Sequence, residues 1–199
     1  IQNKNKMNKN TISATAFILI GGKSERFGSP KWKAKINGKS VLDIVWDACN
    51  SFENRIIVGK EKPDGFEKPF IQDTLKINAP MNGLYTALSN TITDWNLLLS
   101  CDLPLIDFQI INLLGKHLDK EVDAIVPIAN GKTQVTCGYY NKRILPFVEN
   151  EIQKDNYSLF KLVQIINSVN LDFGEDLRFW NMNTKDDMTD IFNYLSDKK

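Results

Sequence analysis

The sequence has very few of the side chains on which most metal and thiol chemistry depends. Its 199 residues include one histidine, His117, and three cysteines, Cys49, Cys101 and Cys137, none of them in a CxxC pair. An odd number of cysteines cannot close into a disulfide framework, and a catalytic thiol would need a histidine base beside it. Structural zinc sites draw on Cys and His clusters. We therefore expect three buried free thiols and a histidine at a helix end.

An excess of one charge and long apolar runs are also absent. The 25 basic residues nearly balance the 24 acidic ones, giving a net charge of +1. Because duplex binding depends on many neutralised phosphates, no nucleic-acid partner is expected. No apolar run approaches the roughly 20 residues of a membrane helix, and the polar start has no signal-peptide core. We expect a cytoplasmic protein without a membrane partner, with a polar tail over residues 1–13 and one domain over 14–199.

Apolar runs typical of buried strands alternate with segments of helical period, which predicts one α/β layer fold with a mostly parallel sheet. The expected strands are Ala14–Ile20, Arg55–Val58, Trp95–Ser100, Val122–Ile128 and Gln134–Tyr140. The expected helices are Val41–Cys49, Leu84–Asn90, Asp107–Leu118, Arg143–Gln153, Leu159–Ile166 and Asp186–Leu195. Ser40 precedes the first of these helices with Asp43 three places on, a capping-box spacing.

The segment AFILIGGKSERFGSPKWK, residues 16–33, runs from an apolar strand into a glycine-rich loop. Such a loop lets backbone N–H groups approach a phosphate closely. It is not a Walker A loop, because Phe17 stands where that motif needs glycine. The glycines at 21, 22 and 28 also miss the dinucleotide spacing, which disfavours a nicotinamide or flavin enzyme.

Two cations stand out in this loop. Only four of the 25 basic residues are arginines, and one of them, Arg26, lies among the glycines five residues before Lys31. A guanidinium offers forked donors to phosphate oxygens, and an ammonium adds a mobile point charge. Together they suit a triphosphate whose charge moves during reaction, although a solvated turn with incidental lysines is the alternative.

The loop resembles the signature L-A-G-G-x-S-x-R-M-G-x-x-K of the molybdenum cofactor guanylyltransferases, small nucleotidyltransferases. The chain departs from it only at Ile20 and Phe27, and the resemblance extends over about residues 14–195. It implies a Rossmann-like three-layer α/β nucleotidyltransferase fold, with nucleotide bound by the amino-terminal half and molybdopterin by the carboxyl-terminal half. It also implies catalytic roles for Arg26 and Lys31. The nucleotide would be bound by Leu19, Ile20, Gly21, Gly22 and Lys31, and the double glycine favours guanine over cytosine.

Two acids follow later strands. Asp102 directly follows the apolar run WNLLLSC and precedes Leu103-Pro104. Open α/β sheets hold ligands and their metals at such strand ends. A carboxylate there can hold Mg²⁺ that bridges phosphate oxygens, and the alternative is an aspartate at a turn before proline. Cys101-Asp102-Leu103-Pro104 matches the C-D-x-P motif of the resembled family, which implies catalytic, nucleotide-binding and metal-binding roles for Asp102. Asp73 resembles that family's second nucleotide-binding aspartate.

Later segments carry the rest of the resemblance. Asn181 and Asn183 match an N-x-N-T element and would bind molybdopterin, while Thr184 could equally cap the last helix with Asp187 three places on. Ala79 stands where the family's Gly-Pro-Leu-x-Gly segment begins with glycine.

The resemblance implies transfer of GMP from GTP to molybdopterin with Mg²⁺ as cofactor, and contact with molybdoenzymes or their insertion chaperones. The near absence of histidine fits this reaction, since a phosphate acceptor is already anionic and needs no strong base. Two alternatives remain open. One is a related nucleotidyltransferase that transfers a cytidylyl group from CTP to molybdopterin, or a nucleotidyl group to a sugar phosphate or another small phosphate. The other is a nucleotide-binding partner module that has lost catalysis.

Overall fold

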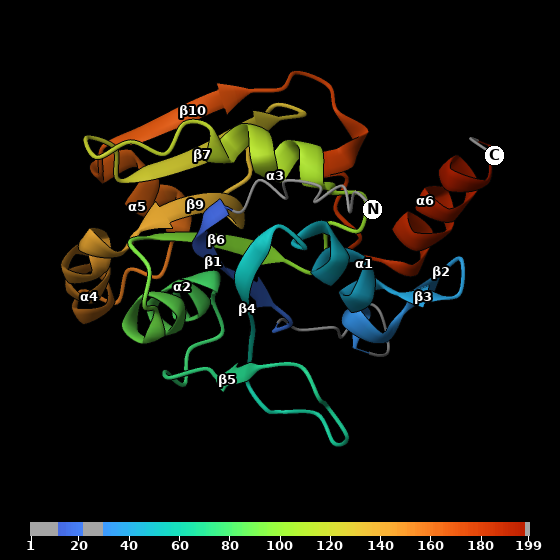
Figure 1. Ribbon diagram of the computed structural model, residues 1–199, viewed down its shortest axis with the longest axis horizontal. Coiled ribbons are helices and arrows are strands. Elements are labelled where there is room, and N and C mark those ends of the chain that lie inside the picture. The colour runs from blue at the N-terminus through green and yellow to red at the C-terminus, as the bar shows by residue number, and fades with distance from the viewer. Residues whose placement is uncertain (1–11, 22–29, 198–199) are drawn as a thin grey trace, which may run out of the picture.

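The computed structural model describes residues 12–21 and 30–197, and it is built around an eight-stranded sheet (Figure 1). The path of this sheet is β10-β7-β9-β6-β1-β4-β5, with β8 paired to β7. The strands are β1 (Ile12–Leu19), β4 (Phe52–Gly59), β5 (Phe70–Gln72), β6 (Trp95–Ser100), β7 (Ala124–Ala129), β8 (Lys132–Thr133), β9 (Cys137–Asn141) and β10 (Ser168–Asp172). A separate hairpin pairs β2 (Lys35–Ile36) with β3 (Lys39–Ser40).

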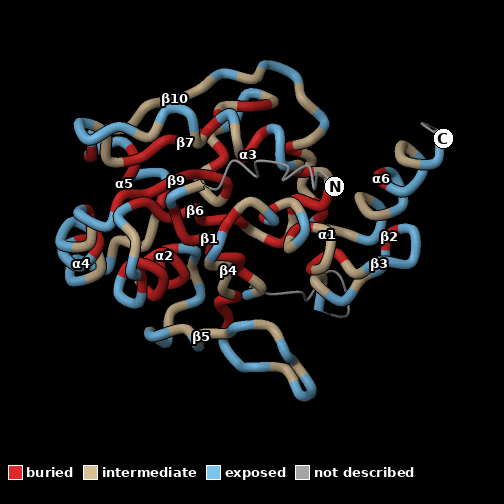
Figure 2. Tube along the Cα trace, in the orientation of Figure 1, coloured by how far each residue is buried: buried red, intermediate tan, exposed pale blue. Residues whose placement is uncertain are grey.

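The strands β6, β1, β4 and β5 run parallel to one another, and among the described strands of this sheet only β8 and β9 run antiparallel to their neighbours. This arrangement confirms the mostly parallel sheet. The central strands are buried on both faces: every residue of β6 except Ser100 is buried, as is the run from Ala14 to Leu19 (Figure 2). Such continuous apolar runs are what a doubly covered parallel sheet requires.

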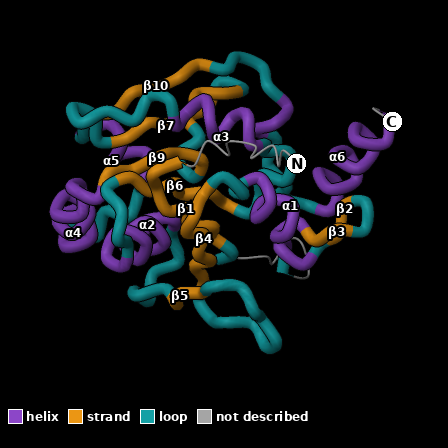
Figure 3. Tube along the Cα trace, in the orientation of Figure 1, coloured by secondary structure: helices purple, strands orange, loops and turns teal. Residues whose placement is uncertain are grey.

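Helices cover both faces of the sheet (Figure 3). They are α1 (Val41–Ala48), α2 (Pro80–Asn90), α3 (Phe108–Gly115), α4 (Leu145–Gln153), α5 (Leu159–Ile165) and α6 (Lys185–Asp197), with short 3-10 turns η1 (Lys31–Lys33), η2 (Lys142–Ile144) and η3 (Leu177–Phe179). One core packs α1 and α3 against the sheet, and a second packs α2, α4 and α5 against the opposite face. These three layers confirm the predicted fold class. No described helix is long and apolar enough to cross a membrane.

A third, smaller core lies beside the sheet, where α6 meets the β2–β3 hairpin and α1 (Figure 1). Its buried members are Ile36, Val41, Met182 and Ile191. The helix α6 begins after Thr184, whose hydroxyl accepts a hydrogen bond from the Asp187 N–H at 3.1 Å. The carboxylate of Asp187 in turn accepts from the Thr184 N–H at 2.7 Å, so the expected cap is present.

The expectations for cysteine and histidine are confirmed. Cys49, Cys101 and Cys137 are free and buried, and burial raises the pKa of the Cys49 and Cys101 thiols to about 12. At that pKa the thiols stay protonated and unreactive at neutral pH. His117 follows the end of α3, and its N–H donates to the Leu114 carbonyl at 3.1 Å.

Candidate functional site

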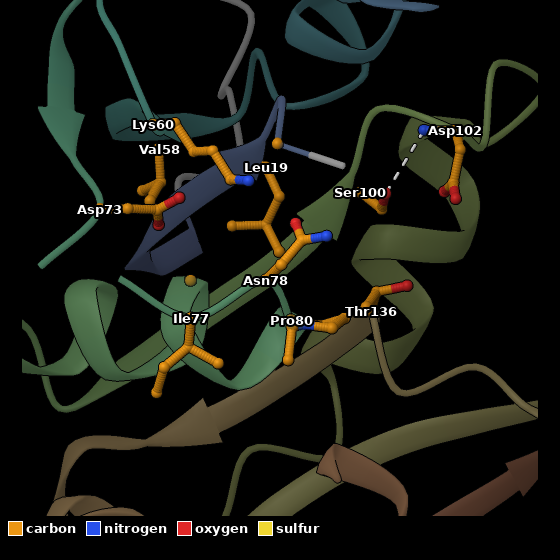
Figure 4. A pocket seen from close by; sticks show the side chains of 13 residues that line it. Leu19, Val58, Lys60, Asp73, Ile77, Asn78, Pro80, Ser100, Asp102 and Thr136 are labelled. Atoms are coloured by element: carbon orange, nitrogen blue, oxygen red, sulfur yellow. Dashed lines mark hydrogen bonds between the residues drawn. The ribbon is translucent and has the colours of Figure 1, made fainter. Parts of the chain in front are cut away.

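A cavity of about 300 Å³ opens at the carboxyl edge of the parallel strands (Figure 4). Its walls come from the ends of β1, β4 and β6, from the residues that follow β5, and from the first turn of α2. Carboxyl ends of parallel strands meet at one edge of a sheet, so residues far apart in the sequence converge here. The cavity therefore lies where an open α/β sheet binds its ligands.

Asp73 and Asp102 both line this cavity and lie on opposite sides of it in Figure 4. Asp73 follows β5, and its N–H donates to the Gly59 carbonyl at 2.8 Å. Burial raises the pKa of the Asp73 carboxyl above its ordinary value, and the charge of Lys60 partly offsets that effect. A Cβ added at Gly21 would stand 3.7 Å from the Asp73 carboxylate, which places the glycine backbone next to this acid.

Asp102 carries a buried carboxylate oxygen, Oδ1, that has no hydrogen-bond partner among the residues that the structure describes. A buried acceptor without a partner is costly unless a further group satisfies it. A hard cation satisfies it well, because Mg²⁺ binds through one or two carboxylates and completes its shell with water and phosphate oxygens. No cluster of three or more His, Cys, Asp or Glu side chains that could enclose a metal occurs among the described residues. The residues present thus fit a shared, substrate-bridging Mg²⁺ and not an all-protein cage.

The first turn of α2 closes the cavity on the side facing β1. A Cβ at Gly83 would lie 2.6 Å from a methyl carbon of Leu19, so a larger residue would force the Leu19 side chain to shift, and glycine lets the helix lie this close to β1. Ala79 precedes α2 with φ −146° and ψ 152°, an extended conformation open to any residue. The alanine at this position therefore causes no backbone strain.

The loop between β5 and α2 is held from inside α2. Asn82 is buried, and its side-chain amide accepts from the Leu75 N–H at 3.0 Å and donates to the carbonyls of Leu75 and Ile77 at 2.7 and 3.2 Å. Thr86 accepts from the Thr74 N–H at 3.0 Å. Because Ile77 lines the cavity, these bonds fix one of its walls.

Lys31, on η1, contacts the segment that precedes α6. Its ammonium donates to the Asn183 side-chain oxygen at 2.9 Å, across 152 positions of sequence. The N–H of Met182 donates to the Asp102 carbonyl at 2.8 Å. Burial is the main cause that raises the pKa of the Cys101 thiol. The charge of Asp102 raises this pKa further and the charge of Lys31 lowers it, so the charges of both candidate residues are felt at this thiol.

Four further expected site residues do not belong to the cavity wall as described. Two of them, Gly22 and Arg26, are outside the described residues. Ile20 is not part of the cavity wall: its side chain packs close to Gly59, where an added Cβ would lie 2.8 Å from it. Asn181 is half-buried, and its side-chain amide donates to the Phe179 carbonyl at 3.4 Å.

Lys60 also lines the cavity, although no sequence motif distinguishes it from the many other lysines of the chain. It directly follows β4, and its ammonium extends across the cavity towards Leu19 (Figure 4). It also lines an adjoining cavity of about 300 Å³ with Asp73, Lys76 and Asn78. Its position just after a parallel strand could have identified Lys60 as a site residue, because Gly21, Asp73 and Asp102 also follow parallel strands.

Comparison with known proteins supports a common origin. The family model described as "MobA-like NTP transferase domain" matches residues 16–167. A Flavobacterium johnsoniae protein named "Probable molybdenum cofactor guanylyltransferase" is 31% identical over 182 residues, covering 89% of this chain and 95% of its own. An Aquifex aeolicus protein of the same name is 32% identical, with 89% of each chain covered.

A solved structure points to the same architecture. The molybdopterin-guanine dinucleotide biosynthesis protein A of Archaeoglobus fulgidus superposes with a TM-score of 0.74 at 20% identity, covering 92% of this chain and 99% of that one, which shows a shared fold. With the family match extending over most of the chain, and with the site geometry described above, the chain belongs to the MobA-like nucleotidyltransferases.

Proposed function

We propose that this protein is a molybdenum cofactor guanylyltransferase that transfers GMP from GTP to the phosphate of molybdopterin and releases pyrophosphate. The observation that carries the proposal is the buried carboxylate oxygen of Asp102 at the carboxyl edge of the sheet, which no described residue hydrogen-bonds. It is the group that a Mg²⁺–triphosphate complex needs there. The names of the Flavobacterium johnsoniae and Aquifex aeolicus relatives support the choice of reaction.

The nucleotide takes the cavity between the amino-terminal strands and α2, and molybdopterin approaches from the carboxyl-terminal half. The nucleoside lies at the end lined by Gly21, Lys60 and Asp73, where the backbone of Leu19 and Gly21 reads the guanine edge. The triphosphate extends towards Asp102 and Lys31. Asn181, in the segment before α6, lies on the acceptor side.

The reaction needs no strong base, because the acceptor phosphate is already anionic. An acceptor oxygen attacks the α-phosphorus of GTP, the bond from that phosphorus to the α–β bridging oxygen breaks, and pyrophosphate leaves with the bonding electrons. The work of the protein is to place two repelling anions in line and to neutralise the charge that develops. Lys31 and Arg26 supply mobile and forked cationic donors for that charge.

Asp102 would hold Mg²⁺, which when bound polarises phosphate oxygens and neutralises developing negative charge. We place the reaction in the cytoplasm. There the dinucleotide product passes to molybdoenzymes or to their insertion chaperones.

The proposal is tested by following labelled GMP from GTP into molybdopterin. Asp102→Ala should lower turnover by roughly 10²-fold or more, the usual loss on removing a single electrostatic element, while circular dichroism shows an unchanged fold. Asp64→Asn, an exposed acid between β4 and β5, is the matched control and should keep the wild-type rate. A near wild-type rate for Asp102→Ala at saturating Mg²⁺ would remove Asp102 from the mechanism.

A further inference from the structure

The small core beside the sheet joins three segments that carry site residues. Ala34 follows Lys31 in η1, and Leu105 follows Asp102 by three positions; both pack against the buried members of this core. Met182, one residue before Asn183, is fully buried in it. One apolar cluster therefore fixes the relative positions of the segments that bear Lys31, Asp102 and Asn183.

Two hydrogen bonds run from this anchored segment to two of the candidate catalytic residues, Asp102 and Lys31. Met182 donates its N–H to the Asp102 carbonyl at 2.8 Å, and Asn183 accepts from the Lys31 ammonium at 2.9 Å. Two adjacent residues of the segment before α6 thus contact both Asp102 and Lys31, although that segment lies far from both in the sequence.

We propose that Asn183 is a positioning residue that holds the Lys31 ammonium for the polyphosphate, in place of the molybdopterin-binding role that the sequence motif implies. The inference rests on the proposed function in one respect, that Lys31 meets a nucleotide's phosphates. An ammonium has three N–H donors, so the bond to Asn183 leaves two for phosphate oxygens. A free lysine side chain loses much rotamer freedom on binding, and Asn183 removes part of that cost in advance.

Asp187 holds Asn183 in turn. Its carboxylate accepts the Asn183 N–H at 2.8 Å and the Thr184 N–H at 2.7 Å. Burial raises the pKa of Asp187, but these hydrogen bonds and the charge of Lys31 outweigh burial, and the net pKa lies below its ordinary value. Asp187 is therefore ionised at neutral pH, and its negative charge attracts the Lys31 ammonium towards the segment before α6.

The test is a double-mutant cycle on the binding of inorganic pyrophosphate with Mg²⁺, measured by calorimetry on the full chain. We expect Lys31→Met to weaken binding about tenfold or more, as loss of a charge-assisted contact does. Asn183→Ala should weaken it about threefold to tenfold. In the Lys31→Met background, Asn183→Ala should change affinity by less than about twofold, because its effect passes through Lys31. Asn193→Ala, exposed on α6, is the matched control and should bind as the wild type does.

Other outcomes overturn the inference. Independent, multiplicative effects of the two substitutions would show that Asn183 does not act through Lys31. Tighter binding by Asn183→Ala would show that Asn183 competes with phosphate for the ammonium. Asn183 is exposed, so the variant should fold, and a thermal melt checks that. A wild type that binds no pyrophosphate also overturns it, whereas intact pyrophosphate binding without GMP transfer contradicts only the proposed reaction.

Discussion

Asp73 and Asp102 are carboxylates at the same sheet edge, yet their surroundings suit different tasks. Asp102 keeps a buried oxygen without a partner in the part of the chain that the structure describes, which suits a cation. The Asp73 carboxyl faces Lys60, and burial raises its pKa. Ionisation of Asp73 at neutral pH therefore lowers the stability of the folded state. Such destabilised ionised groups are common at ligand-binding sites.

Asp73→Asn should stabilise the apoprotein at neutral pH while weakening its affinity for GTP. A raised carboxyl pKa means that the folded state prefers the protonated form, so its stabilising contribution is complete in acid and is lost as the pH rises through the folded pKa. The melting temperature of the variant should thus exceed that of the wild type at pH 7, and the two should converge below about pH 4, the ordinary range of an aspartate. A lower melting temperature for the variant at pH 7 would mean that the carboxylate makes favourable contacts in the apoprotein.

Lys60→Met should weaken GTP affinity about fivefold to tenfold, because a cation that extends across the cavity loses its charge while its apolar stem is kept. Equilibrium titration with GTP measures this directly. Lys132→Met, exposed in β8 and away from the cavity, should bind GTP as the wild type does. Equal affinities for the wild type and Lys60→Met would exclude Lys60 from the nucleotide site.

At the scale of elements, α2 supports the cavity from two directions. Gly83 lets the helix approach β1, and Asn82 fastens the preceding loop with hydrogen bonds to Leu75 and Ile77. The binding wall is thus an irregular segment made rigid by a buried side chain on the helix that follows it.

Asn82→Ala should destabilise the protein by about 2–4 kcal/mol, because it leaves a backbone N–H and two carbonyls of the loop without their partner. GTP affinity should fall with it as the wall loosens. Chemical denaturation and GTP titration measure the two effects. Asn90→Ala, exposed at the end of the same helix, should cost less than about 1 kcal/mol and leave GTP affinity unchanged. An Asn82→Ala variant of full stability would show that water replaces the side chain in holding the loop.

For the whole molecule, apolar runs were sufficient to predict the central strands, and Trp95–Ser100 is observed with the predicted bounds. The edge strands β5 and β10 were missed because short, half-exposed segments such as Ser168–Asp172 lack a long apolar run. The bounds of the first strand also differ from the prediction, because β1 ends at Leu19 and not at Ile20. The helix caps at Ser40 and Thr184 depend on local spacing and were predictable.

The candidate site was predictable only in part. Motifs identified Asp73, Asp102 and Gly21, which do line one cavity. They could not reveal the bond between Lys31 and Asn183, because contacts across 152 residues depend on how the small core packs. Nor could they single out Lys60, whose importance comes from its place at the end of β4.

The central claim is guanylyl transfer to molybdopterin, and the most direct test compares GTP, CTP and ATP in pyrophosphate release with molybdopterin as acceptor and Mg²⁺ present. GTP should turn over at least about tenfold faster than either competitor, since a single polar contact in a buried site gives discrimination of that order. The product should be a guanine dinucleotide. A clear preference for CTP, or GTP binding with no turnover, would contradict it.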